Sequence, residues 1–179
     1  MIPQLETARL QLRQFVIDDL DGLSRIYRNP EVMRYVGKGT RTREETQSAI
    51  VSLIKHYQQG FGIWAVVYKD NSQLIGLCGL CFLDNTSEVE LGYLLDKRYW
   101  GKGLATEGSH ASLKYGFEVV KLERIVAIAK PENLASRRVM EKVGMKYEKN
   151  AHFYGYDVVY YALSREVYQP PDSLYILRK

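Results

Sequence analysis

The chain has 179 residues, of which 46% are hydrophobic and 26% are charged, and its formal net charge is +4 at pH 7. This length and composition are typical of one soluble globular domain, long enough to bury a core without disulfides or a structural metal. They exclude a disordered or a collagen-like protein. The small positive excess suits an anionic small ligand as well as a nucleic acid, so it identifies neither.

No targeting or membrane-spanning segment is expected. The sequence lacks a run of about 18 apolar residues, which a transmembrane helix requires. The first residues also lack the basic stretch followed by an apolar one that marks a signal peptide. These observations favour a cytoplasmic protein with no membrane contact.

The first predicted elements alternate between strand and helix. Apolar and polar residues alternate over 10–15, which predicts a strand, and Asp18 and Asp19 offer N-cap chemistry for a short helix. Residues 30–36 are expected to add a further helical turn or two. Thr42 lies three residues before Glu45, a capping box that predicts a second helix, which ends at Gly60.

The middle of the chain is rich in β-forming residues. The runs 61–69 and 73–83 flank a turn at 70–72 and predict a hairpin. A further strand at 87–95 alternates, so that Glu90 and Leu94 share one face and Tyr93 and Leu95 share the other.

Helices and strands alternate again in the last part. A helix is predicted at 103–121, a strand at 124–129, a helix after Asn133 with Ala135, Val139 and Val143 inward, and a final strand at 154–167. The order predicts an α/β (α+β) fold with a mixed, mostly antiparallel central sheet and helices on both faces. We expect a single domain over residues 1–168 and a C-terminal tail over 169–179.

Both cysteines lie in one C-x-x-C motif, Cys78 to Cys81, inside the predicted strand 73–83. Side chains three positions apart in a strand point to opposite faces, so these thiols are expected to be buried separately. No second C-x-x-C completes a zinc site, and His56, His110 and His152 lack metal-ligand spacing. We therefore expect no metal; His152 is kept as a possible contact of the substrate.

The most informative stretch is a Gly-punctuated turn between the strand at 87–95 and the helix after it. Gly101 and Gly103 allow the backbone N–H groups and the helix dipole to meet phosphate oxygens. Lys97, Arg98 and Lys102 add positive charge. The same glycines also suit an ordinary connecting turn, so this pattern alone leaves both interpretations open.

Two common phosphate motifs do not fit the turn. No Walker sequence occurs in the chain, and the third glycine of a dinucleotide fingerprint is replaced by Thr106.

The pattern Arg98-x-x-Gly101-x-Gly103-x-Ala105 resembles the acyl-CoA pyrophosphate loop of the GNAT superfamily of N-acetyltransferases. A second family-like motif follows, with Asn133-x-x-Ser136 and then residues 139–145. The segments 7–13 and 101–107 are most similar to the RimJ/RimL-like branch, which acetylates the N-termini of ribosomal proteins. The resemblance spans residues 5–167 and implies a single GNAT-like domain that uses acetyl-CoA as cosubstrate.

The resemblance also implies roles for particular residues. The strand end at Leu94 and Leu95 is expected to pair through its backbone with the pantetheine arm, which Asn133 also contacts. The residues expected to hold the pyrophosphate are Arg98, Trp100, Gly101, Lys102, Gly103, Leu104 and Ala105.

One family feature is missing. Many relatives have a Tyr four residues before the glycine at 144, where it acts as a general acid, but this chain has Met140, which cannot donate a proton. Ser136 is the expected replacement, and Tyr154 and Tyr156 are weaker candidates.

Glu90 is the candidate catalytic base. An alkylamine arrives as an ammonium ion with a pKa of about 10, and a nearby carboxylate can accept its proton directly or through water. The resembling family often has an acidic residue at this point of the strand. The alternative for Glu90 is a solvated polar face, and Glu88 is the second candidate base.

Three classes of function remain to be compared. The favoured one is an N-acetyltransferase that transfers acetyl directly, in a ternary complex, to a protein N-terminus or a small-molecule amine. The alternative is a catalytically weak acyl-CoA-binding sensor or assembly module, which Met140 supports. Nucleic-acid binding is not expected, because no basic stripe with interleaved aromatics occurs. The acceptor, and the choice between monomer and homodimer, stay open.

Overall fold

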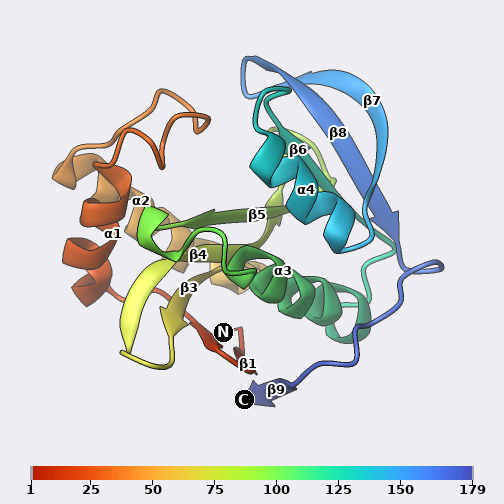
Figure 1. Cartoon of the computed structure of the whole chain (residues 1–179), viewed down its shortest axis with the longest axis horizontal. Coiled ribbons are helices and arrows are strands. Elements are labelled where there is room, and N and C mark those ends of the chain that lie inside the picture. The colour runs from red at the N-terminus through yellow and green to blue at the C-terminus, as the bar shows by residue number, and fades with distance from the viewer. Residues whose placement is uncertain (1, 179) are drawn as a thin grey trace.

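The computed structural model describes residues 2–178, so Met1 and Lys179, the outermost residues of the expected domain and tail, lie outside the described residues. Over that range nine strands form one sheet in the order β7-β8-β6-β5-β4-β3-β2-β1-β9 (Figure 1). The strands are β1 (Gln4–Thr7), β2 (Leu10–Arg13), β3 (Ile63–Tyr68), β4 (Gln73–Phe82), β5 (Val89–Leu95), β6 (Arg124–Ala129), β7 (Lys146–Phe153), β8 (Tyr156–Ser164) and β9 (Tyr175–Arg178). Neighbouring strands are antiparallel except β5 and β6, which are parallel. The predicted α/β fold is confirmed.

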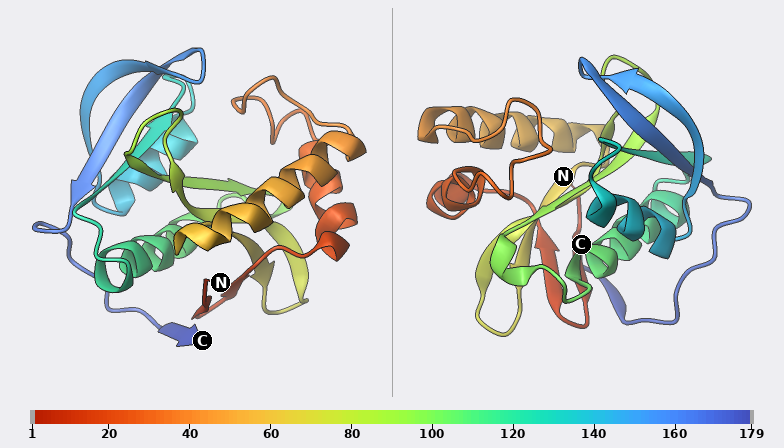
Figure 2. Two further views of the ribbon diagram at one scale, coloured as in Figure 1. Left: turned by 180° about the vertical axis from the view of Figure 1, so that it is seen from behind. Right: turned by 45° about the horizontal axis from the view of Figure 1, so that its top comes forward.

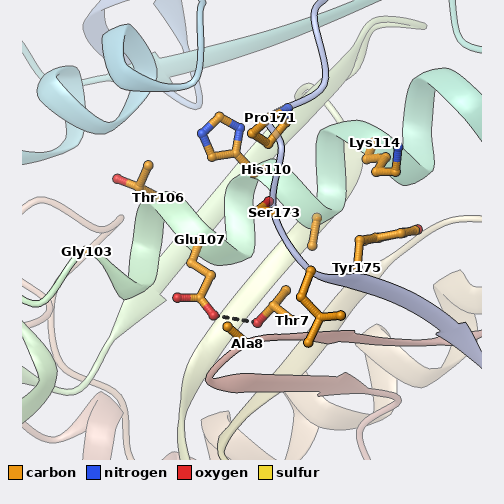
Figure 3. A pocket seen from close by; sticks show the side chains of 12 residues that line it. Thr7, Ala8, Gly103, Thr106, Glu107, His110, Lys114, Pro171, Ser173 and Tyr175 are labelled. Carbon is orange, nitrogen blue, oxygen red and sulfur yellow. Dashed lines mark hydrogen bonds between the residues drawn. The ribbon is translucent and has the colours of Figure 1, made fainter.

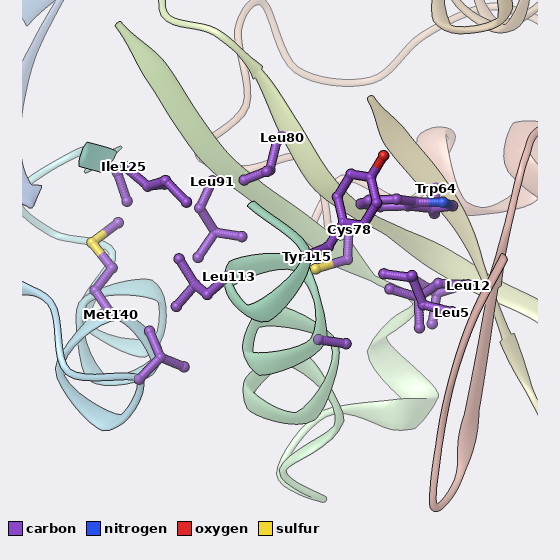
Figure 4. Packing of buried hydrophobic residues seen from close by; sticks show 14 of the residues in the cluster. Leu5, Leu12, Trp64, Cys78, Leu80, Leu91, Leu113, Tyr115, Ile125 and Met140 are labelled. Atoms are coloured by element: carbon purple, nitrogen blue, oxygen red, sulfur yellow. The ribbon is translucent and has the colours of Figure 1, made fainter. Parts of the chain in front are cut away.

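Helices cover both faces of this sheet (Figures 1 and 2). The helices are α1 (Leu20–Tyr27), α2 (Arg43–His56), α3 (Leu104–Lys114) and α4 (Leu134–Lys142). Under α1 and α2 lies a smaller core that includes Leu23, Ile50 and Ile63. Under α3 and α4 lies the larger core, in which Leu113 and Met140 pack among strand residues (Figure 4). Between residues 2 and 178, no helix combines the length and the apolar composition that crossing a membrane requires.

Several local predictions are confirmed. The Thr42 side chain accepts from the Glu45 N–H at 3.1 Å and the Glu45 carboxylate accepts from the Thr42 N–H at 2.8 Å, which is the capping box of α2. Strands β3 and β4 form the predicted hairpin. Cys78 lies in the larger core and Cys81 packs against the smaller one, on the opposite face.

The start of α1 corrects one prediction. Asp19 does not cap α1; its carboxylate accepts two hydrogen bonds from Arg13, at 2.7 and 2.8 Å, and one from the Val16 N–H at 2.9 Å. A guanidinium offers a stronger, bidentate partner than a helix N–H does. Residues 30–36 form turns and not the expected helical extension.

The second half of the chain differs from the prediction in three places. The predicted helix at 103–121 is helical from Leu104 to Val119, but its type changes: α3 ends at Lys114 and a π-helical segment, Tyr115–Val119, continues it. Of the residues expected to point inward from α4 and its C-cap, Val143 is buried and Val139 is half-buried, but Ala135 is exposed; Met140 is buried as well. The final strand begins at Tyr156, which leaves Tyr154 in a turn.

Strands β1, β7 and β9 have no counterpart among the predicted elements. The residues of β7 are mostly exposed and polar, so the strand lacks the alternation that marks a half-buried one. In the tail, β9 follows the two prolines at 170–171 and pairs with β1, for example Leu177 with Leu5. The edge of the sheet beyond β1 is thereby covered.

Candidate functional site

The sheet opens between its two parallel strands. Within the described chain, β5 and β6 share a single bridged pair, Glu90 with Val126, while β4 continues to pair with β5 up to Leu95. The helix α3 follows β5 and α4 follows β6, so both helices begin near the carboxyl ends of these strands. In open α/β sheets such a crevice is where ligands bind.

The end of β5 directs backbone groups into this gap. The Asp96 N–H donates to the Ile75 carbonyl on β4 at 2.7 Å. Because backbone groups alternate sides along a strand, those of Leu95 point away from β4. The Leu95 carbonyl accepts from the indole N–H of Trp100 at 2.9 Å, so Trp100 folds back over the strand end.

The glycine turn presents free N–H groups. Gly101 and Gly103 have φ of 72° and 74°, in the left-handed region that favours glycine. Gly103 is the N-cap of α3, and no side chain caps the helix there. The first N–H groups of α3, from Leu104 onward, therefore have no helix partner and are available to an anion. Around a Cβ placed on Gly101 nothing lies within 4 Å, so the turn is open on that side.

Two of the three cations that the sequence predicted around this turn are paired with carboxylates. Lys97 pairs with Glu31 at 2.6 Å and Arg98 pairs with Asp96 at 2.7 Å. The hydrogen bond from Arg98 holds the pKa of the Asp96 carboxyl below its usual range. Among the described residues Lys102 has no carboxylate within 4.0 Å; its ammonium lies 5.4 Å from the centre of the Tyr99 ring. Backbone N–H groups and Lys102 are what remains to meet a phosphate.

A network anchored on Glu107 holds this turn in place, and Figure 3 shows its hydrogen bond between Glu107 and Thr7. The Glu107 carboxylate accepts from the Thr7 hydroxyl at 2.6 Å, from the Arg9 N–H at 2.8 Å and from the Arg9 Nε at 2.7 Å. Arg9 Nη1 also donates to the Lys102 carbonyl at 2.9 Å. Burial alone raises the pKa of Glu107, but the hydrogen bonds from Thr7 and Arg9 outweigh it and hold the pKa below its usual range.

The Glu107 network shows what part of the segment 7–13 does in the fold: Thr7 and Arg9 bind Glu107 of α3. Its residues join the β1–β2 turn to the first turns of α3. They also form one wall of a groove of about 270 Å³, which α3 and the C-terminal tail complete.

A larger cleft, of about 770 Å³, opens on the α1 and α2 side of the sheet. It is lined by α1, α2 and the segment before α2, by parts of β3, β4 and β5, and by the turn after β7. Arg41 lies on one wall, half-buried, with its guanidinium 4.6 Å from the centre of the Tyr27 ring. In the described chain no carboxylate lies within 4.0 Å of Arg41.

Glu90 does not lie on a solvated face. The lining of the large cleft includes Cys81 and Tyr154 but not Glu90, whose carboxylate lies behind them. The Tyr154 hydroxyl donates to Glu90 Oε1 at 2.8 Å, and the Cys81 thiol donates to the same oxygen at 3.4 Å. Burial raises the pKa of Glu90, and the hydrogen bonds from Tyr154 and Cys81 offset only part of this rise. A carboxyl shifted in this direction is closer to the pKa of a useful base.

Glu88, the second candidate base, has a different partner. Its carboxylate accepts from the Tyr160 hydroxyl on β8, in a small cluster that also includes Leu83 and Val126.

The start of α4 brings Ser136 to β5. Asn133 caps the helix by accepting from the Ser136 N–H at 3.2 Å. The Tyr93 hydroxyl donates to the Ser136 carbonyl at 2.7 Å and lies 2.9 Å from Ser136 Oγ, so that Oγ must be the donor in the second bond. Tyr93 was assigned only to a strand face by the sequence, and no local signal in the sequence indicated this partner.

The other candidates lie in different places. Met140 is 1% exposed and points into the same core cluster as Ile125 and Leu113 (Figure 4). Tyr156 donates to the Gly37 carbonyl at 2.9 Å, which connects β8 to the segment before α2. His152 is exposed on β7 and pairs with Asp157 at 2.9 Å. Among residues 2–178, no three acidic, histidine or cysteine side chains gather as metal ligands would.

Comparisons with known proteins identify the family of the chain. Residues 9–146 match the acetyltransferase (GNAT) domain family. The chain is 34% identical over 151 residues to YoaA of Bacillus subtilis, an uncharacterized N-acetyltransferase, with 83% of this chain and 85% of that protein covered.

Solved structures show the same fold. An acetyltransferase of the GNAT family from Bacillus anthracis is 30% identical, with a TM-score of 0.81 and coverage of 91% of this chain and 99% of that one. RimL, a ribosomal-protein acetyltransferase in complex with coenzyme A, is 18% identical with a TM-score of 0.76, over 88% of this chain and 95% of that one. At 18% identity, the similarity to RimL supports the fold alone.

Proposed function

The chain belongs to the acetyltransferase (GNAT) family of acyltransferase enzymes, and from that membership we propose that it transfers acetyl from acetyl-CoA directly to a primary amine. The observation that carries the proposal is the hydrogen-bonded pair of Tyr154 and the half-buried Glu90, which lies beside a cleft large enough for an acceptor. The enzyme would hold both substrates in one ternary complex, because proximity then supplies much of the rate.

On the cofactor side, the turn at 100–105 and the start of α3 suit a pyrophosphate. The left-handed glycines expose N–H groups, the helix dipole adds positive potential, and Lys102, which has no carboxylate partner in the described chain, supplies a cation. Arg98, whose guanidinium pairs with Asp96, would contribute its backbone and shape the turn. At the strand end formed by Leu94 and Leu95, Leu95 would offer backbone groups to the pantetheine arm, because those of Leu94 point toward β4. Asn133 would meet the same arm from α4.

On the acceptor side, Glu90 is the proposed base. Its raised pKa lets it accept a proton from an ammonium more readily than an ordinary carboxylate does. The removal of that proton frees the lone pair of the amine for attack on the thioester.

For the departing sulfur, Ser136 is the proposed hydrogen-bond donor in place of the family tyrosine. A thiol has a pKa of about 8.5, so a thiolate needs only modest stabilisation to leave. The hydroxyls of Ser136 and Tyr93 are already hydrogen bonded to each other, and Ser136 lies at the start of α4 beside the gap. This pair would take the role of the family tyrosine, and Met140, which stands at that position, packs in the larger core.

The finer assignments are also proposals. We place the chain in the RimJ/RimL-like branch on the segments 7–13 and 101–107. We assign transfer to residues 1–168, with the tail at 169–179 supporting the edge of the sheet, in a cytoplasmic protein. The choice between monomer and homodimer does not enter the mechanism, because every proposed site residue comes from one chain.

A sensor that binds acyl-CoA without transfer is not favoured. Such a module has no need for a half-buried base beside an acceptor-sized cleft, and the relatives are named as N-acetyltransferases.

The proposal is tested by an acceptor panel with acetyl-CoA, in which thiol release reports turnover and mass spectrometry identifies the acetylated amine. The panel includes peptides with free N-termini, polyamines, amino sugars, and amines offered both with and without a carboxylate, because Arg41 lacks an acidic partner in the described chain. We expect saturable thiol release with at least one class. Binding of acetyl-CoA without release for any amine would favour the sensor and overturn the proposal.

A further inference from the structure

Tyr154 has a backbone conformation that is unfavourable for a bulky aromatic residue. Residues 154 and 155 form the two-residue turn between β7 and β8, with φ of 52° at Tyr154 and 79° at Gly155. Two positive φ values in a two-residue hairpin favour Asn-Gly or Asp-Gly. A bulky aromatic residue in the first position is therefore held there by its surroundings.

Two hydrogen bonds with Asp84 keep Tyr154 in this conformation. Asp84, in the loop between β4 and β5, also has a left-handed backbone, with φ of 47°. The Tyr154 N–H donates to Asp84 Oδ2 at 2.8 Å, and the Asp84 N–H donates to the Tyr154 hydroxyl oxygen at 2.8 Å. Two disfavoured backbone conformations thus face each other and fix the position of one hydroxyl group. Strained residues that cluster in this way mark functional sites more often than chance placement does.

The fixed hydroxyl lies between the cleft and the candidate base. Tyr154 and Asp84 both line the large cleft, while Glu90 does not. The proton of the Tyr154 hydroxyl is directed at Glu90 Oε1 at 2.8 Å, and one lone pair of its oxygen accepts from Asp84. An amine in the cleft therefore reaches the hydroxyl oxygen before it reaches the carboxylate.

We infer that the Tyr154 hydroxyl is a catalytic proton relay, which takes a proton from the acceptor ammonium as it gives its own proton to Glu90. One N–H bond of the ammonium and the original O–H bond of Tyr154 break; a new O–H bond forms on Tyr154 and another on Glu90. The amine is left neutral with a free lone pair, Tyr154 is unchanged overall, and Glu90 carries the proton. This inference rests on the proposed role of Glu90 as the base.

The surroundings of the relay are consistent with it. The titratable groups that face Glu90 are Tyr154 from the turn, Cys81 from β4 and Asp84 from the loop. Burial raises the pKa of Cys81, so its thiol stays protonated and neutral at neutral pH. The Asp84 N–H, which already donates to the hydroxyl oxygen, stabilises the negative charge that builds on it while the proton moves.

The turn offers matched variants at a single position. Tyr154→Phe keeps the ring and removes the hydroxyl, while Tyr154→Asn removes the hydroxyl and restores a residue that this turn prefers. We expect both to fold, with Tyr154→Asn at least as thermostable as Tyr154→Phe. In both we expect kcat to fall about 100-fold, near the lower end for a lost acid–base group, with the acetyl-CoA Kd unchanged. Tyr147→Phe is the control: it removes a hydroxyl from an exposed tyrosine of β7 that does not line the large cleft, and should stay within about threefold of the original kcat.

The decisive measurement combines Tyr154→Phe with Glu90→Gln, using whichever amine in the panel releases thiol fastest. A relay acts as a unit, so the double variant should be nearly as slow as either single variant, and all three should recover as pH rises toward the pKa of the amine. Full kcat in Tyr154→Phe alongside a slow Glu90→Gln would overturn the relay and leave Glu90 as the base. Losses that multiply at every pH would also overturn it, because they indicate separate roles. Full kcat in Glu90→Gln, with chemistry rate-limiting, would instead overturn the base itself.

Discussion

The two halves of the site are built in opposite ways. The turn proposed for the cofactor is one continuous stretch, residues 98–105, whose ligand groups are backbone N–H groups. The acceptor half joins Asp84, Glu90 and Tyr154, and the hydrogen bonds between Asp84 and Tyr154 span 70 positions of the chain. A site made of backbone can be recognised from a short motif, whereas a site made of side chains depends on which strands become neighbours.

Their electrostatics differ as well. Around the turn, hydrogen bonds from Arg98 hold the pKa of Asp96 below its usual range, and those from Thr7 and Arg9 outweigh burial and do the same for Glu107. These lowered pKa values favour the charged carboxylates, which stabilise the shape of the loop. Beside the cleft, burial dominates and raises the pKa of Glu90. The charged carboxylates of the turn stabilise its structure, whereas the raised pKa of Glu90 suits its proposed role in proton transfer. We therefore expect substitutions in the two halves to affect different properties.

The largest effect is expected for Glu90→Gln, which breaks the acceptor half alone. The substitution keeps shape and removes the proton acceptor, so kcat near neutral pH should fall about 10²–10⁴-fold. The rate should recover as pH rises, because more of the amine is then already neutral. The acetyl-CoA Kd, measured by calorimetry, should be unchanged; a raised acceptor KM with intact kcat would indicate attraction of the cation and not base catalysis.

Gly103→Val should break the cofactor half alone. A β-branched residue in the left-handed region costs about 1–2 kcal/mol, and the turn can relieve this only by giving up the conformation that presents its N–H groups. We expect acetyl-CoA affinity to fall about tenfold or more by calorimetry. Gly144→Val is the control, since Gly144 also has a left-handed φ, of 93°, but lies after α4; equal loss of affinity in both variants would contradict the assignment.

Glu107→Gln tests the cofactor half more finely, because it weakens the hydrogen bonds that hold the turn and leaves the residues of the turn unchanged. The variant loses charge-assisted bonds to Arg9, so acetyl-CoA affinity should fall roughly threefold to tenfold, or about 0.7–1.4 kcal/mol. Because the pKa of Glu107 is lower in the folded protein, its contribution to stability is present above the usual carboxyl range. It is lost as pH falls through the lowered value, below about pH 4. The Tm difference between the original protein and the variant should therefore shrink on acidification; a constant difference from pH 7 to 3 would refute this role.

The smallest catalytic effect is expected for the double Cys78→Ala, Cys81→Ala variant. Burial raises the pKa of Cys78 to about 11 and also raises that of Cys81, so neither thiol forms a nucleophilic thiolate at neutral pH. Turnover should stay within about threefold of the original value. The replacement of the buried Cys78 should lower the free energy of unfolding by about 1 kcal/mol. An acetylated cysteine, found by mass spectrometry after mixing with acetyl-CoA alone, would contradict direct transfer.

The amino-acid sequence by itself determined the features that act over a few residues. The capping box of Thr42 and Glu45, the opposite facing of Cys78 and Cys81, and the glycine turn before α3 follow from periodicity and backbone preference, which neighbours in the chain set. The position of Glu90 on the face shared with Leu94 followed from the same alternation.

Only the tertiary structure decided which side chains meet. Local preference disfavours Tyr154 in its turn, and β7 before it lacks alternation, so nothing nearby in the chain indicated that this tyrosine reaches Glu90. The hydrogen bonds of Tyr93 with Ser136, and of Asp19 with Arg13 in place of a helix end, were likewise not indicated by residues nearby in the chain. Such pairs depend on strand register and on the order of strands in the sheet, which are settled by burial of the two cores across the whole chain.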